Sequence, residues 1–300
     1  MDELEIIEWV RARSRTHSSI RVGIGDDMAI VDAGAGCFLV STDLLLDQVH
    51  FDSKIHSPTQ IGRKAVARSL SDCAAMAVRP VSVLISVALP RSMPDPAIRE
   101  LFQAMCNTAA QFGAVIAGGD TARWNSPLAI DVAVTGEPYL GIEPVPRKGA
   151  KLGDVVYSTG RLGGSILGRH LTFLPRIDEA RTIATKLGGK LHAMIDISDG
   201  LTLDLWRLCQ ESGVGALLDE SLILEAVSDD ARTLARTDGI SDLQHALSDG
   251  EDYELLMAVD PSATISGLPV LPLGRIVQSG LSMTRVHGVV EALVPRGFVH

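Results

Sequence analysis

The chain has 300 residues, of which 27 are Lys or Arg and 37 are Asp or Glu, so its net charge at pH 7 is −10. This length is typical of two domains or one large one, and 46% hydrophobic residues are enough to form a buried core. The acidic balance and the 4% of aromatic residues argue against a nucleic-acid partner. The negative charge also argues against an anionic membrane surface as a partner.

The sequence predicts a cytoplasmic protein without a membrane span. Its longest apolar stretch, 81–89, is far shorter than the roughly 20 residues that a spanning helix needs. The first residues are acidic, where a signal peptide would be basic. The cysteines form no CxxC pair, which is typical of reduced thiols rather than of disulfides or a zinc site; they are Cys37, Cys73, Cys106 and Cys209.

The first half of the chain alternates between predicted strands and helices. Apolar residues recur at helical spacing in two stretches, which predicts helices over 58–77 and 96–112. Pro58 suits the first position of the former helix. Short apolar runs bounded by Gly and Asp predict strands, at 21–24, 29–32, 37–46, 81–89, 114–117 and 128–135.

A segment rich in Pro and Gly, 138–153, is the best candidate for a domain boundary. Beyond it the pattern predicts strands at 155–159, 192–195, 215–218 and 253–259, helices at 201–212 and 225–237, and short strands from 269 onward. This order indicates an α/β fold with two domains, residues 1–140 and residues 141–300.

Aspartates in apolar or Gly-rich settings are the main chemical signal; they are Asp26, Asp27, Asp43, Asp72, Asp120, Asp196 and Asp199. Each alone is commonly a turn residue or a helix cap. Asp72 differs, because it falls inside a predicted helix among apolar neighbours, and an unpaired buried carboxylate is costly. Arg63, Lys64 or Arg68 is therefore expected to form an ion pair with Asp72, if that residue has a structural role.

Taken together, the aspartates are typical of ligands for a hard cation. Mg²⁺ binds oxygen donors, often carboxylates together with substrate phosphates. An acidic cluster repels a nucleotide triphosphate unless metal ions reverse the local charge. The pattern thus favours Mg²⁺-assisted phosphoryl transfer.

Other motifs are weaker or absent. The chain has no P-loop, no GxGxxG fingerprint, no HExxH and no GxSxG. The Gly-rich turn 160–165 either presents backbone N–H groups to a phosphate or simply reverses a strand into a helix. His50 is the one histidine close to a candidate site, although lone histidines are more often structural.

Eight motifs in this order resemble the thiamine-monophosphate kinase family, within the superfamily of aminoimidazole ribonucleotide synthetase. The resemblance extends from about residue 20 to 260 and is weaker beyond. The motifs are Gly23-Ile24-Gly25-Asp26-Asp27, Ser41-Thr42-Asp43, His50-Phe51, Leu70-Ser71-Asp72-Cys73-Ala74-Ala75-Met76, Gly118-Gly119-Asp120-Thr121, Arg147-Lys148-Gly149-Ala150, Ile195-Asp196-Ile197-Ser198-Asp199-Gly200-Leu201 and Gly250-Glu251-Asp252-Tyr253-Glu254-Leu255.

The resemblance implies a homodimer in which the N-terminal sheets of two copies close a β-barrel with helices outside, followed by a C-terminal α/β domain. It also implies ATP-dependent phosphorylation of thiamine monophosphate to thiamine diphosphate. By motif position, several Mg²⁺ ions would be held by Asp27, Ser41, Thr42, Asp43, Asp72, Asp120, Asp196 and Asp199. ATP would contact Gly119, Asp120, Arg147 and Ser198, and the thiamine substrate would contact His50, Glu251 and Phe298.

Such a reaction needs no catalytic base, because the acceptor is a phosphate oxygen that is already largely ionised at neutral pH. The barrier is repulsion between two polyanions and the need for alignment, so we expect direct in-line transfer. Two alternatives stay open. One is another ATP-dependent enzyme of the superfamily that acts on a different small phosphorylated metabolite, and the other is a non-catalytic nucleotide-binding paralogue.

The chain also departs from the family pattern. Asp249 stands where the family has the first glycine of Gly-Gly-Glu-Asp, and Ala122 replaces a threonine. Only residues 165–174 separate the Gly-rich turn from Pro175-Arg176, where the family has a longer helical segment. These changes leave the metal-ligand positions intact, so they bear on acceptor choice more than on phosphoryl transfer.

Overall fold

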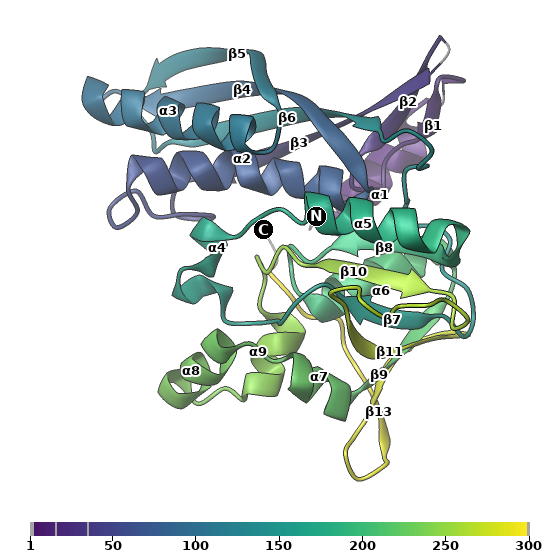
Figure 1. The fold of residues 1–300 in the computed structure, drawn as a ribbon. Helices are drawn as coiled ribbons and strands as arrows, with labels where there is room; N and C mark the ends of the chain where they lie inside the picture. The colour runs from purple at the N-terminus through teal and green to yellow at the C-terminus, as the bar shows by residue number, and fades with distance from the viewer. Residues whose placement is uncertain (1–2, 16, 35, 299–300) are drawn as a thin grey trace.

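The structure is a computed structural model that describes residues 3–15, 17–34 and 36–298 (Figure 1). After helix α1 (Glu3–Arg13), the first half forms a six-stranded sheet in the order β1-β2-β3-β6-β4-β5. Neighbouring strands are antiparallel except for β4 and β5. The strands are β1 (Ile20–Val22), β2 (Ala29–Ala33), β3 (Gly36–Leu46), β4 (Val78–Pro90), β5 (Val115–Trp124) and β6 (Ala129–Pro138).

The second half forms a seven-stranded sheet in the order β13-β12-β9-β11-β7-β10-β8. Its strands are β7 (Val155–Ser158), β8 (Leu191–Asp196), β9 (Gly215–Asp219), β10 (Leu255–Val259), β11 (Leu271–Val277), β12 (Leu281–Thr284) and β13 (Val290–Ala292). Its helices are α4 (Arg169–Thr172), α5 (Ile177–Leu187), α6 (Leu201–Ser212), α7 (Glu220–Ala226), α8 (Asp229–Asp238) and α9 (Asp242–Ser248), with 3-10 turns η1 (Ser165–Leu167) and η2 (Gly188–Lys190).

The mixed α/β fold with two sheets is as predicted, and the predicted helices at 58–77, 96–112 and 201–212 correspond to α2 (Pro58–Ala75), α3 (Asp95–Gln111) and α6. The predicted helix at 225–237 is wrong in extent. It is divided between α7 and α8, because Ser228 adopts an extended backbone and its hydroxyl caps α8 by accepting from the N–H of Ala231. The strand predicted at 114–117 continues as β5 to Trp124.

The first sheet does not close into a barrel within this chain, because β1 and β5 lie at its two edges. The change from one sheet to the other falls between Pro138 and Val155. None of the described helices is long and apolar enough to cross a membrane.

Helix α2 lies between the two sheets and packs on both (Figure 1). It begins with a capping box, in which Ser57 and Gln60 satisfy each other's backbone N–H groups. One apolar core combines residues of α2 with the inner faces of both sheets, including Leu39, Val132 and Met257. Strand β10 alternates between this core and a second core under α6, so all five of its residues are buried. Polar residues on α2 therefore point into a junction between the halves.

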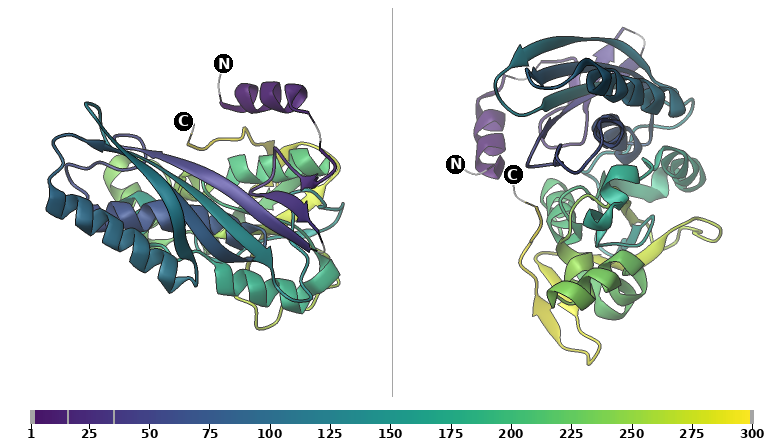
Figure 2. Two further views of the ribbon diagram at one scale, coloured as in Figure 1. Left: turned by 90° about the horizontal axis from the view of Figure 1, so that it is seen from above. Right: turned by 90° about the vertical axis from the view of Figure 1, so that its left-hand side faces the viewer.

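The two faces of the first sheet differ. On β3 the residues that face α2 include Leu39, Ser41, Asp43 and Leu45, whereas Thr42 and Leu44 point to the opposite face. Helices α2 and α3 lie on the inner side, and the two views of Figure 2 show the outer face without a helix across it. The outer face is consequently available for packing against another surface.

Gly62 allows α2 and α3 to pack closely, because a Cβ atom built there would lie 2.4 Å from the carbonyl oxygen of Leu101. We expect overpacking in Gly62→Ala to lower the free energy of unfolding by about 1–3 kcal/mol. The higher helix propensity of alanine offsets about 1 kcal/mol of this loss. The free energy of unfolding in urea measures this loss. Gly189→Ala, at a site with open space around it, is the control. Equal midpoints for the two variants would contradict the close packing.

Candidate active site

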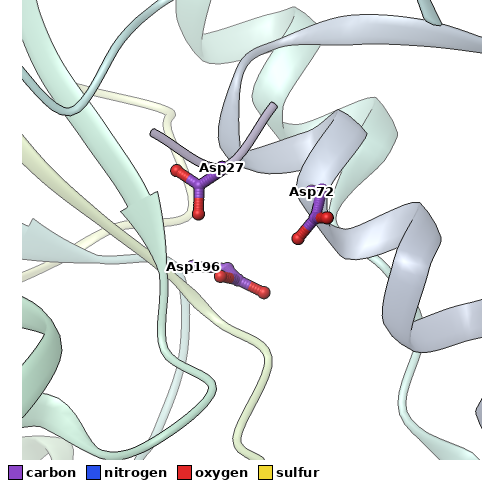
Figure 3. A group of neighbouring side chains, drawn as sticks. All are labelled: Asp27, Asp72 and Asp196. Atoms are coloured by element: carbon purple, nitrogen blue, oxygen red, sulfur yellow. The ribbon is translucent and has the colours of Figure 1, made fainter. Parts of the chain in front are cut away.

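Three carboxylates from distant parts of the chain converge at the junction between α2 and the second sheet. Asp27 follows the first strand, Asp72 lies on α2 and Asp196 ends β8. One oxygen of each lies within 4.8 Å of the others, and Figure 3 shows the side chains pointing toward a common centre. The structure therefore brings three of the predicted metal-ligand residues together.

Two of the three are held by specific partners. Arg147 binds Asp27 with a fork of two hydrogen bonds, Nη2 to Oδ1 at 2.6 Å and Nε to Oδ2 at 3.1 Å. The hydroxyl of Ser71 donates to Asp196 at 2.6 Å. Burial, followed by the charge of Asp27, raises the pKa of Asp196 to about 8. The cluster is therefore fixed in geometry while its negative charge is only partly compensated.

Asp72 has no cationic partner among the described residues, so the expected ion pair with Arg63, Lys64 or Arg68 is not formed. Arg63 donates to the carbonyl groups of Leu171 and Phe173 instead. Lys64 and Arg68 bind other carboxylates, as described below. Burial and the neighbouring carboxylates, Asp43 first among them, raise the pKa of Asp72 well above its ordinary value. The position is thus better suited to a bound cation than to a structural ion pair.

Two further oxygens at this junction have no hydrogen-bond partner in the described part of the chain. The hydroxyl of Ser41 and Oδ2 of Asp43 are both buried and unpaired. They lie on the face of β3 that points toward α2. Buried polar atoms are almost always satisfied, and every donor here is an oxygen, which is the preference of Mg²⁺. The residues present fit a hard divalent cation.

A pocket of about 690 Å³ reaches toward these carboxylates at Arg68, which lines it and whose Nε lies 3.2 Å from Oδ1 of Asp43. Its wall is formed by residues of four segments that are far apart in the sequence, 48–56, 165–170, 248–253 and 297–298, together with Arg68, Ser198, Asp199 and Leu234. The predicted substrate residues His50, Glu251 and Phe298 all line it. The pocket is large enough for a small metabolite.

A buried lysine fixes Glu251 at the wall of this pocket. Lys64 is fully buried, and its Nζ lies 2.7 Å from Oε1 and 2.8 Å from Oε2 of Glu251. It also donates to the carbonyl of His50 and lies 3.0 Å from Nδ1 of His170. Burial acts to raise the pKa of Glu251, but contacts with His170 and the charge of Lys64 lower it to about 2. Glu251 is therefore ionised and held rigidly.

The Gly-rich turn 160–165 does not present its N–H groups to the solvent. The N–H of Gly163 donates to Asp252 and that of Gly164 donates to Oδ2 of Asp249 at 2.8 Å. Of the two alternatives for this turn, the structure thus supports the structural one. Asp249, the departure from the family pattern, also contacts His245 at 3.0 Å. The carboxylate of Asp249 thus holds this turn in place, and Asp249 also lines the pocket.

The other predicted site residues lie in different places. Ser198 and Asp199 line the pocket, and Asp199 is paired with Arg207. The hydroxyl of Thr42 points to the outer face of the sheet and donates to Asp131 at 2.8 Å. Gly119 and Asp120 lie on edge strand β5, where β6 and β4 separate them from β3. The structure therefore does not bring the side chains of Thr42 and Asp120 to the carboxylate cluster.

The sequence did not predict Lys64, Arg68 and His170 as site residues, and it offered the first two only as structural partners of Asp72. Lys64 and Arg68 precede Asp72 by eight and four residues, so helical spacing places all three on one face of α2. That spacing was the available signal. His170 had none, because its short helix α4 reaches the pocket only through the tertiary fold.

Residues 25–137 match the family model described as AIR synthase related protein, N-terminal domain. Thiamine-monophosphate kinase from Rhodopirellula baltica is 36% identical over 99% of this chain and 97% of its own length. The enzyme of that name from Mycobacterium tuberculosis strain H37Rv is 33% identical over 85% of this chain and 80% of its own. The chain belongs to the thiamine-monophosphate kinase family.

Solved structures agree with this assignment. The structure described as "AaThiL complexed with AMPPCP and TMP" has a TM-score of 0.87 and 26% identity, and covers 100% of this chain and 97% of that one. Thiamine-monophosphate kinase from Stenotrophomonas maltophilia has a TM-score of 0.70 and 28% identity, with coverage of 94% and 96%.

The buried pair of Lys64 and Glu251 joins α2 to the second half of the chain. Removing one partner of such a pair leaves an uncompensated charge, so we expect Lys64→Met to cost about 3 kcal/mol, the lower end of the usual range. Urea denaturation measures this cost. The double variant Lys64→Met/Glu251→Gln should recover much of it, since no charge is then left unpaired. Additive losses in the double variant would contradict the pairing.

Proposed function

We propose that the protein transfers the γ-phosphoryl group of ATP to thiamine monophosphate, giving thiamine diphosphate and ADP. The observation that carries this proposal is the position of the acceptor-sized pocket, which adjoins a carboxylate cluster suited to Mg²⁺. Membership of the family supports the choice of acceptor. The related AaThiL structure holds AMPPCP, an ATP analogue, and TMP.

Asp27, Asp43, Asp72 and Asp196, with Ser41, are the residues that we propose to hold several Mg²⁺ ions. When bound, these ions would neutralise phosphate charge and polarise the phosphoryl group. Arg147 holds Asp27 in place. Metal binding by Thr42, Asp120 and Asp199, and ATP contacts at Gly119, Asp120, Arg147 and Ser198, remain predictions from the family resemblance.

The chemistry needs alignment more than proton transfer. The second ionisation of a phosphate monoester has a pKa of about 6, so the attacking oxygen is largely ionised at neutral pH. The carboxylates of Glu251 and Asp199 suit the cationic thiazolium ring of the acceptor, and the ring of Phe298 offers it an apolar contact. These residues would position the acceptor and exclude water, which favours direct in-line transfer without a phosphoenzyme.

We also infer that the enzyme works as a homodimer through the outer face of the first sheet. Leu44 and Leu84 are 53% and 43% exposed on this face, and Phe38 is also exposed there. Pairing of the open edges with a second copy would close the barrel that one chain leaves open. The cysteines are free thiols, which supports work in a reducing compartment such as the cytoplasm.

The reaction is tested by mixing the protein with Mg²⁺, ATP and thiamine monophosphate and resolving the products by ³¹P NMR. We expect Mg²⁺-dependent formation of thiamine diphosphate and ADP. Asp72→Asn should lower kcat by on the order of 10²–10³-fold, because it removes a charge from the cluster. Asp229→Asn, whose side chain is 95% exposed on α8, should leave kcat unchanged. Binding of ATP without product would favour a non-catalytic paralogue, and turnover with another phosphorylated metabolite would favour a different acceptor.

The dimer is tested by light scattering coupled to gel filtration. We expect a mass of twice 31.9 kDa for the native chain. Leu84→Asp should give a monomer, because it places a charge in the proposed apolar contact. Leu140→Asp, at a fully exposed loop residue, is the matched control and should stay dimeric. A monomeric native protein, or loss of the dimer in both variants, would count against this interface.

A further inference from the structure

One face of α2 connects the pocket with the carboxylate cluster. Lys64, Arg68 and Asp72 follow one another at intervals of four residues, and each interval advances about 6 Å along a helix axis. Lys64 binds Glu251 at the wall of the pocket, and Asp72 points to Asp27 and Asp196. Arg68 therefore lies between the region proposed for the acceptor ring and the region proposed for metal.

Arg68 is the only Arg or Lys among the described residues that line the pocket. Four carboxylates line it as well, namely Asp52, Asp199, Asp249 and Glu251. A ligand that carries a phosphate dianion would meet repulsion from these groups and from the cluster beyond. The guanidinium of Arg68 is a permanent positive charge in the pocket wall that can offset this repulsion, whereas Lys64 and Arg207 are already paired with Glu251 and Asp199.

The guanidinium of Arg68 makes one hydrogen bond to the described residues and keeps further N–H donors available. Its Nε donates to Oδ1 of Asp43 at 3.2 Å, and its side chain is 15% exposed. Its terminal nitrogens donate to no described residue. By contrast, all three guanidinium nitrogens of Arg147 donate hydrogen bonds, to Asp27 and to the carbonyl of Gly25. Lys64 likewise has three partners, in His50, His170 and Glu251. Within the described part of the chain, Arg68 alone combines unused guanidinium donors with a place in the pocket wall.

We propose that Arg68 binds the phosphate of the acceptor and holds it where the pocket meets the carboxylate cluster. A planar guanidinium matches two oxygens of one phosphate, which a lysine ammonium does not. Asp43 accepts from Nε, so the two terminal nitrogens remain to donate to the ligand. This assignment rests on the proposed function, because it takes thiamine monophosphate as the acceptor.

The test separates phosphate recognition from general effects on the pocket. Isothermal titration in Mg²⁺ without ATP measures binding of thiamine monophosphate and of thiamine, which lacks the phosphate. We expect Arg68→Gln to weaken binding of the monophosphate by about 10- to 100-fold, as for lost hydrogen bonds to a charged group. Binding of thiamine should change by less than about threefold, within the error of such comparisons. Arg99→Gln, at an exposed arginine of α3, is the control.

Arg68→Lys provides a second variant that keeps the charge. It should lose part of the affinity for the monophosphate and none for thiamine, because it lacks the fork. Equal weakening of both ligands by Arg68→Gln would overturn the proposal, as would unchanged binding of the monophosphate. These outcomes do not depend on turnover. A native protein that distinguishes the two ligands but makes no thiamine diphosphate would refute the proposed kinase activity and leave the role of Arg68 intact.

Discussion

Burial of charge along α2 is the constraint on which the rest of the structure depends. The helix is packed on both sides, so each of its charged residues must find a partner within the protein or in a ligand. Lys64 forms an ion pair with Glu251, and Arg63 donates hydrogen bonds to two carbonyl groups at the end of α4. These contacts tie the helix to the second half of the chain and fix its rotation. Asp72 is thereby directed toward Asp27 and Asp196.

The second half of the chain is organised around the same contacts. Glu251 and Tyr253 both have a positive φ, a conformation that is rare for residues other than glycine. Hydrogen bonds of their N–H groups to Ser198 and Ile197 hold them there, and Phe173 stacks on Tyr253 with ring centroids 3.9 Å apart. The surrounding packing thus holds a strained segment at the pocket wall, as is common at functional sites.

Much of this could be predicted from the sequence, for reasons that particular residues make plain. The long helices have clear periodicity and start signals, such as Ser57-Pro58 before α2. The aspartates at strand ends and in α2 stood out because carboxylates are unusual among apolar neighbours. The sequence pattern therefore groups Asp27, Asp72 and Asp196 with other aspartates, and it does not separate them from Asp120, which lies on edge strand β5.

The remaining features depend on pairings that a single sequence does not encode locally. Thr42 and Asp43 lie on opposite faces because side chains alternate along a strand, but which of them faces α2 depends on the register of β3 against β6, and a shift by one residue would exchange them. Gly119 lies in line with Asp43 across β6 and β4, a separation of about 14 Å at the usual strand spacing. The partner of Lys64 is 187 residues away. The order of the motifs along the chain indicates which family the residues belong to, whereas the distances between the residues are set by the order of the strands in the sheet.

The order of charges at the site also bears on which small molecules suit it. Glu251, Asp199 and Asp249 line the pocket, Arg68 stands at its inner side, and the carboxylates of Asp27, Asp72 and Asp196 lie beyond. A ligand with a cationic ring at one end and a phosphate at the other matches this alternation in one orientation only. Reversed, its phosphate would face carboxylates without the guanidinium between them, and its ring would lie where the phosphoryl group must be transferred. Because Lys64 and Arg207 already bind Glu251 and Asp199, charge would favour this orientation only in part, and direct contacts to the ring would supply the rest of the discrimination.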